Sequence, residues 1–238
     1  MKILNTSTKN ELTALFSAYQ NSFGDEKLNE IVSRQFVNCV LYEDLPLLIC
    51  GLNPSYRKTE GKDLAYDFDF NDAKIKNDRY FKKFHHFAGS TKSNYIELFS
   101  QRHTSQADLH LFLADKKGVE FLVKQLEISQ NAIEAMKPKL IFIFNRFAGH
   151  FWGRDAETTA DGEQKGIWMG YTFEPTDIEG AFKISGLSES QERINSSLTQ
   201  TNLIGSIIYF STFISYRDNK EAMTKIEADV PALIRRFC

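Results

Sequence analysis

The residues best suited to chemistry form the short segment Gly51-Leu52-Asn53-Pro54-Ser55, which follows an apolar run. Gly51 allows the backbone to turn sharply or to approach a ligand closely. Asn53 carries a hydrogen-bond donor and an acceptor on a short side chain. Pro54 disfavours helical geometry at Asn53, so the amide would be held rigidly at the end of a strand. Such an amide can orient a polar ligand or a water molecule, although Asn-Pro-Ser is also typical of an ordinary turn.

Four short apolar runs, separated by helical patterns, must position this segment. They cover residues 45–51, 95–99, 139–144 and 203–210, and their length and Ile, Leu and Phe content are typical of buried strands. The nearly continuous apolarity of the first and third runs favours parallel strands covered on both faces. We therefore expect one α/β domain over residues 1–238, a three-layer αβα sandwich around a mostly parallel four-stranded sheet.

Three other stretches complete this expectation. Residues 36–42 are consistent with an additional strand, and residues 153–186, which hold six of the 13 glycines, with a small hairpin or an irregular insertion. Asn145, directly after the third run, is a suitable N-cap for a short helix. In an open parallel sheet the ligand crevice lies outside the carboxyl ends of the strands, so the residues after each run are the candidates for a site.

The segment Leu47–Ser55 resembles the first motif of the uracil-DNA glycosylase superfamily, in the Gly-x-Asn-Pro form of its mismatch-specific and single-strand-selective branches. Residues 138–148 resemble the third strand and following helix of that superfamily. Residues 94–102 and 209–217 stand where its second strand and last motif are expected. The resemblance covers roughly residues 36–237 as architecture and implies a uracil-DNA glycosylase-like fold. It also implies hydrolysis of the N-glycosidic bond of a deaminated or damaged base in DNA.

The resemblance implies a role for several residues. Asn53 matches the position that places the attacking water, a role of orientation because an amide is a weak base. The nucleotide would be flipped out of the duplex into a pocket. An aromatic ring would stack on the base, and the candidates are Tyr56, Phe81, Phe84 and Phe87, each of which can equally be a packing residue. The further candidates for substrate binding are Gly51, Pro54, Ser55, Tyr56, Glu97 and Asn145.

The chain also departs from the family pattern. The last motif is usually His-Pro-Ser or Asn-Pro-Ser, and its polar side chain stabilises charge on the departing base. Here the segment reads Phe210-Ser211-Thr212-Phe213, so Ser211 and Thr212 are the remaining catalytic candidates, each offering one neutral hydrogen bond. These departures leave two alternatives open: a catalytically inactive module that binds nucleic acid or a nucleotide, and an interaction domain.

The charge balance excludes a uniformly basic nucleic-acid-binding domain, since the formal net charge is −2 and the pI is near 6.2. Contacts to DNA would need a local basic surface, and the candidates are Arg57, Lys58, Lys82, Lys83 and Arg217. The densest mixture of basic and aromatic residues lies at 79–86, which can also be a solvated helix.

Cysteine usage and hydropathy limit the remaining classes. Cys39, Cys50 and Cys238 are too few and too widely spaced for a structural zinc site or a four-cysteine iron–sulfur cluster, so we expect no cofactor and no metal. No apolar run reaches the roughly 20 residues of a membrane helix, and the N-terminus lacks the apolar core of a signal peptide. We expect a cytoplasmic protein without a membrane partner.

Overall fold

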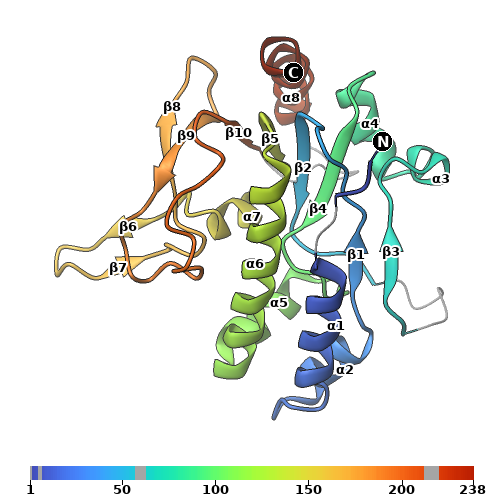
Figure 1. Ribbon diagram of the computed structural model, residues 1–238, viewed down its shortest axis with the longest axis vertical. Helices are drawn as coiled ribbons and strands as arrows, with labels where there is room; N and C mark the ends of the chain where they lie inside the picture. Colours follow the sequence, from blue (N-terminus) through green and yellow to red (C-terminus); the bar gives the residue numbers. More distant parts are fainter. Residues whose placement is uncertain (1, 5–6, 57–62, 212–219) are drawn as a thin grey trace.

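The computed structural model describes residues 2–4, 7–56, 63–211 and 220–238. Across these residues the main sheet has six strands in the order β4-β2-β5-β10-β9-β8 (Figure 1). β4, β2, β5 and β10 run parallel to one another, whereas β9 and β8 are antiparallel additions at one edge. The strands are β4 (Ser93–Glu97), β2 (Leu47–Gly51), β5 (Leu140–Ile143), β10 (Ile207–Phe210), β9 (Ala181–Leu187) and β8 (Tyr171–Pro175).

The prediction of an α/β protein with a mostly parallel sheet is confirmed, and the predicted number of four strands is wrong. Each of the four apolar runs overlaps one of the four parallel strands, although β4 begins two residues before its run. The glycine-rich stretch 153–186 contributes β8 and part of β9, which extend the same sheet. The extension is held in part by aromatic contacts, because the rings of Phe173 and Phe182 lie 5.4 and 5.9 Å from that of Phe210. These contacts join residues that are far apart in the chain. The local hydrophobic pattern of a segment therefore does not predict them.

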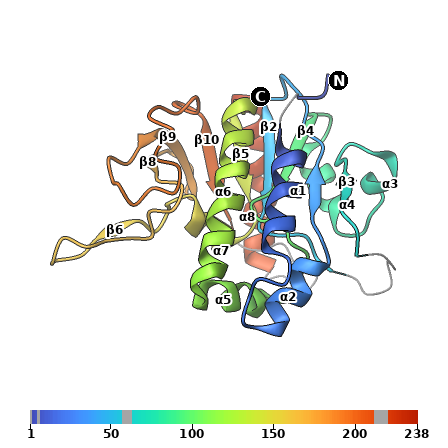
Figure 2. The same cartoon turned by 60° about the horizontal axis from the view of Figure 1, so that its bottom comes forward.

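Two smaller sheets lie outside the main one. The run at 36–42 forms β1 (Val37–Cys39), which pairs in parallel with β3 (Tyr66–Phe68) rather than joining the main sheet. β6 (Glu157–Thr158) and β7 (Gln164–Lys165) form an exposed hairpin that projects from the body of the protein (Figure 2).

Helices cover both faces of the main sheet (Figures 1 and 2). Successive residues of each parallel strand face opposite layers, so Leu48 and Cys50 of β2 join one core while Leu47 and Ile49 join the other. The first core includes α1 (Thr8–Tyr19), α2 (Glu26–Ser33), α5 (Gln106–Ala114), α6 (Lys116–Met136) and α7 (Arg146–Phe151). The second core includes α4 (Phe81–Ala88), preceded by α3 (Ala73–Lys76), and α8 (Lys220–Phe237).

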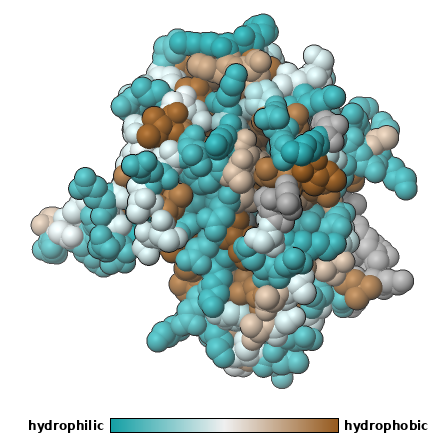
Figure 3. All heavy atoms as spheres, in the orientation of Figure 1, coloured by the Kyte–Doolittle hydropathy of each residue, from teal (hydrophilic) through white to brown (hydrophobic). Residues whose placement is uncertain are grey.

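Hydrophilic side chains cover most of the face shown in Figure 3, and hydrophobic residues appear there as separate patches. Among the described residues, no helix is both long enough and apolar enough to cross a bilayer.

α5 and α6 meet at Gly118, where a side chain would overlap the backbone. A Cβ atom at this buried glycine would lie 2.3 Å from the carbonyl oxygen of Phe112 and 2.8 Å from its Cα. We expect Gly118→Ala to lower the free energy of unfolding by about 2 kcal/mol, as overpacking of a close-packed contact does. Urea denaturation followed by circular dichroism measures this change.

The matched control is Gly24→Ala, because a Cβ atom at Gly24 meets nothing within 4 Å. Equal stabilities of the two variants would show that the contact between α5 and α6 relaxes at no cost.

Candidate functional site

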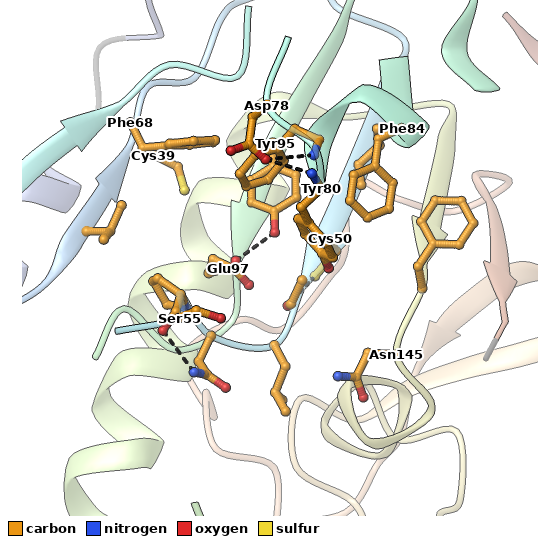
Figure 4. Close-up of a pocket in the computed structure, with 18 of the residues that line it drawn as sticks. Cys39, Cys50, Ser55, Phe68, Asp78, Tyr80, Phe84, Tyr95, Glu97 and Asn145 are labelled. Carbon is orange, nitrogen blue, oxygen red and sulfur yellow. Dashed lines mark hydrogen bonds between the residues drawn. The ribbon is translucent and has the colours of Figure 1, made fainter. Parts of the chain in front are cut away.

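A cavity of about 1110 Å³ opens at the carboxyl ends of the parallel strands, on the side of the sheet that α4 covers (Figure 4). The segment after β2, the end of β4 and the segment after β5 all line it. Residues of β1, β3, α3 and α4 complete its walls. The cavity therefore lies where the parallel-sheet topology predicts a ligand site.

Asn53 lines the cavity, and its amide is fixed by two hydrogen bonds. Its Nδ2 donates to the carbonyl of His103 (2.7 Å) and to that of Pro54 (3.1 Å). The Pro54 carbonyl also accepts the backbone N–H of His103 (3.1 Å), so the two segments are tied together. Both amide hydrogens are thereby used, and the amide oxygen accepts no hydrogen bond from the described residues. Asn53 is held rigidly, with an acceptor atom available to a ligand.

Glu97, the last residue of β4, is a buried carboxyl in the cavity wall. Its Oε1 accepts a 2.6 Å hydrogen bond from the hydroxyl of Tyr95, and its Oε2 has no hydrogen-bond partner in the described part of the chain. Burial raises the pKa of Glu97 to about 8, against the opposing effect of the Tyr95 hydrogen bond. The carboxyl group is therefore mostly neutral at pH 7.

Gly51 provides the room that the Glu97 carboxyl occupies. β2 and β4 pair with Gly51 opposite Glu97. A Cβ atom at position 51 would lie 2.1 Å from Glu97 Oε2 and 2.6 Å from the Tyr95 hydroxyl oxygen. The absence of a side chain at Gly51 thus allows the close approach of the carboxyl group to the backbone.

Aromatic rings form much of the remaining wall. The ring of Phe81 lies 4.9 Å from that of Phe68 and 5.3 Å from that of Tyr95. The rings of Phe84 and Phe144 are 5.3 Å apart. These five residues, with Tyr80, line the cavity and give it flat apolar surfaces.

Asn145 reaches the cavity from the start of α7. Its Oδ1 accepts the backbone N–H groups of Phe147 (2.9 Å) and Ala148 (3.3 Å), which confirms the predicted N-cap. Its Nδ2 has no hydrogen-bond partner among the described residues. Figure 4 shows Asn145, Glu97 and Ser55 around one part of the cavity.

The structure thus brings together six of the residues that the sequence singled out. They come from three strand ends and line one cavity: Gly51, Asn53, Pro54, Ser55, Glu97 and Asn145. Of the proposed stacking rings, Phe81 and Phe84 line it as well.

Two other stacking candidates lie elsewhere. The ring of Tyr56 packs under the guanidinium groups of Arg34 (4.2 Å) and Arg102 (5.2 Å), and its hydroxyl donates to Asp63 (3.1 Å). Phe87 is buried in the core behind the cavity.

The remaining candidates stand apart from the cavity lining or outside the described residues. Ser211 follows β10, and its N–H donates to the carbonyl of Ile143 (2.9 Å). Lys82 is exposed and Lys83 half-buried on α4, and neither lines the cavity. The predicted residues that lie outside the described part of the chain are Thr212, Arg57, Lys58 and Arg217.

Sequence reasoning missed two residues of the site. Tyr95 could have been predicted from the sequence, because residues i and i+2 of a strand share a face. Tyr95 stands two residues before Glu97, the charged residue of that run. His103 belongs to no motif of the sequence and only the structure places it beside Asn53. Its Nδ1 lies 2.9 Å from the carbonyl of Ser105, so Nδ1 donates and the buried Nε2, without a partner in the described residues, is an acceptor. Burial lowers the pKa of His103, which favours this neutral form.

The described residues contain no group of three or more His, Cys, Asp or Glu side chains placed to bind a metal ion. Cys50 is buried, Cys39 is half-buried and Cys238 is exposed, and all three are free thiols. Comparison of the chain with protein-family models and with curated proteins finds no match.

Proposed function

We propose that this protein is a divergent, uracil-DNA glycosylase-like enzyme of a three-layer αβα architecture. It hydrolyses the N-glycosidic bond of a damaged or deaminated DNA base held in the cavity, and Asn53 positions the attacking water. The observation that carries the proposal is the fixed amide of Asn53, whose nitrogen is bound by two carbonyl groups and whose oxygen is left for a ligand.

The cavity has the properties that a flipped base requires. Its volume, about 1110 Å³, is slightly above the usual range of small-molecule sites, roughly 300–1,000 Å³, so a base fits inside. The rings of Phe81, Phe84 and Phe144 offer surfaces for stacking, as pockets for flipped bases do. Glu97 and Asn145 add polar atoms that can select the edge of the base.

The chemistry assigned to Asn53 is orientation of water. The amide oxygen accepts a hydrogen bond from water, which directs an oxygen lone pair toward C1′ of the sugar. The bond from C1′ to the base nitrogen breaks, its electron pair stays with the base, the water oxygen bonds to C1′, and a proton is released. Fixing the water in this position lowers the entropic part of the barrier.

The test is the formation of abasic sites in oligonucleotides that contain uracil, hypoxanthine or xanthine, or in DNA with alkylated bases. We expect Asn53→Ala to reduce the rate on any processed substrate by about 10²-fold, the effect of losing a positioning group. Asn10→Ala, at an exposed asparagine of α1, is the matched control and should leave the rate unchanged. Failure to form abasic sites above the level without protein, or full activity of Asn53→Ala, would disprove the proposal.

A second candidate is a binding module on the same fold that performs no hydrolysis. It is favoured by the sequence after β10, where residues 211–216 include neither His nor Asn. Salt-dependent binding of DNA without abasic sites would support this candidate.

A further inference from the structure

Glu97 Oε2 is a buried oxygen that the described residues leave without a hydrogen-bond partner. The side chain is only 8% exposed, and Tyr95 supplies a hydrogen bond to the other oxygen alone. Glu97 forms no ion pair with the described residues. A buried carboxyl group stays mostly protonated at neutral pH unless its ionised form is paired and hydrogen-bonded. A ligand that carries an N–H group and a positive charge would supply both.

The walls around Glu97 favour the same kind of ligand. The faces of aromatic rings carry partial negative charge and attract cations, most strongly where water is excluded. The cavity wall beside Glu97 contains three aromatic rings in tilted or edge-to-face contact, those of Phe68, Phe81 and Tyr95. A flat cation matches both the aromatic surfaces and the carboxyl group.

Arg79 is the one arginine among the described residues that line the cavity, and it does not oppose this match. Arg79 is an exposed residue next to Asp78, so it belongs to the rim of the cavity. A cation at the rim can bind a phosphate of the DNA backbone, whereas the buried carboxyl group can bind the base inside the cavity.

The sequence after β10 agrees with a cationic base. A neutral base such as uracil departs with negative charge, which a hydrogen-bond donor must stabilise. Residues 211–216, where the family resemblance places that donor, contain neither His nor Asn. A purine nucleotide alkylated at N3 or N7 is already positively charged and departs as a neutral base, so it needs no such donor.

We propose that the base accepted by this cavity is a positively charged, N-alkylated purine. The base lies between the aromatic walls, and Glu97 accepts a hydrogen bond from its amino group and pairs with its positive charge. This inference rests on the proposed glycosylase function and names its substrate class. In the reaction the C1′–N bond breaks, its electron pair neutralises the purinium ring, water adds its oxygen to C1′, and one proton goes to solvent.

The experiment compares two substrates with the full-length protein. One is DNA methylated with dimethyl sulfate, from which 7-methylguanine and 3-methyladenine are measured by chromatography. The other is the set of oligonucleotides with uracil or hypoxanthine, and spontaneous loss without protein is subtracted from both. We expect methylpurine release by the wild type and a decrease of at least about 10-fold in Glu97→Gln, which keeps the size of the side chain but cannot ionise beside a cation. Glu192→Gln, at an exposed glutamate, is the control.

The outcomes separate the two proposals. Release of uracil or hypoxanthine without methylpurines would overturn the inference and leave the glycosylase function in place. Release of neither class would overturn the glycosylase function. Equal methylpurine release by Glu97→Gln and the wild type would also refute the role of Glu97.

A binding measurement gives a readout that does not depend on hydrolysis. By equilibrium dialysis at neutral pH, 1-methyladenosine, a cation, should bind at least about 10-fold more tightly than neutral adenosine, and Glu97→Gln should lose this preference. Circular dichroism establishes that the variant is folded. Equal affinity of the folded wild type for the two nucleosides would contradict the inference.

Discussion

The free energy of unfolding of the wild-type protein should fall, relative to that of Glu97→Gln, by up to about 5 kcal/mol as the pH rises from about 4.5 to about 8. The cause is the burial of Glu97, which raises its pKa from 4.5 to about 8 in the folded protein. Between these values the folded state keeps a proton that the unfolded state has lost. Below pH 4.5, the pKa in the unfolded protein, the neutral carboxyl contributes its full share of the free energy of unfolding. This contribution is lost as the pH rises through about 8, the pKa in the folded protein.

This prediction is measured by urea denaturation at a series of pH values. Only the difference between the wild type and Glu97→Gln is interpreted, because the other titrating groups are common to both proteins. Glu192→Gln removes an exposed carboxyl and should follow the wild type over the whole range. Parallel curves for the wild type and Glu97→Gln would mean that Glu97 is ionised in the folded protein, with a donor supplied from elsewhere.

Replacement of Glu134 by alanine should lower the free energy of unfolding by about 3 kcal/mol, because several buried donors would lose their acceptor. Glu134 lies on α6 and is 4% exposed. Its Oε1 accepts the hydroxyls of Tyr171 (2.8 Å) and Thr201 (2.6 Å), and its Oε2 accepts the N–H of Asn202 (2.7 Å). This carboxyl thus joins α6 to the antiparallel part of the sheet and to the turn before β10.

The control for this prediction is Glu120→Ala, which removes an exposed glutamate from the same helix. Its effect should be within about 0.5 kcal/mol, the usual range for surface positions. Denaturation by urea and by heat measures both variants. A loss of stability no larger in Glu134→Ala than in Glu120→Ala would show that water replaces the carboxyl at no cost.

The sequence predicted the residues of the candidate site only where their position follows from a single short segment. Asn53 and Pro54 were placed correctly at the end of β2, and Asn145 at the start of α7, because strand ends and N-caps follow from local residue order. Glu97 was among the candidates, but its partner Tyr95 and its lack of a donor were not foreseen. The contact with Tyr95 lies within β4 and follows from the strand period, whereas the lack of a donor depends on which strand pairs with β4 and on which helix covers it.

The sheet shows the same division. The four parallel strands were predicted because each overlaps a short apolar run, which is typical of a buried parallel strand. A small hairpin was among the predictions for residues 153–186, but the addition of β8 and β9 to the main sheet was not. These two strands are less buried than the parallel ones and pack against Phe210, which is distant in the sequence.

The sequence by itself determined the α/β class, the parallel centre of the sheet and the strand end that carries Asn53, since these follow from periodicity and from proline and cap chemistry within a few residues. Only the tertiary structure decided that the site is an aromatic cavity with a buried carboxyl. That property arises from the register that sets Gly51 opposite Glu97 and from α4, which brings its rings over β4. Burial, and with it the raised pKa of Glu97, depends on neighbours from distant parts of the chain.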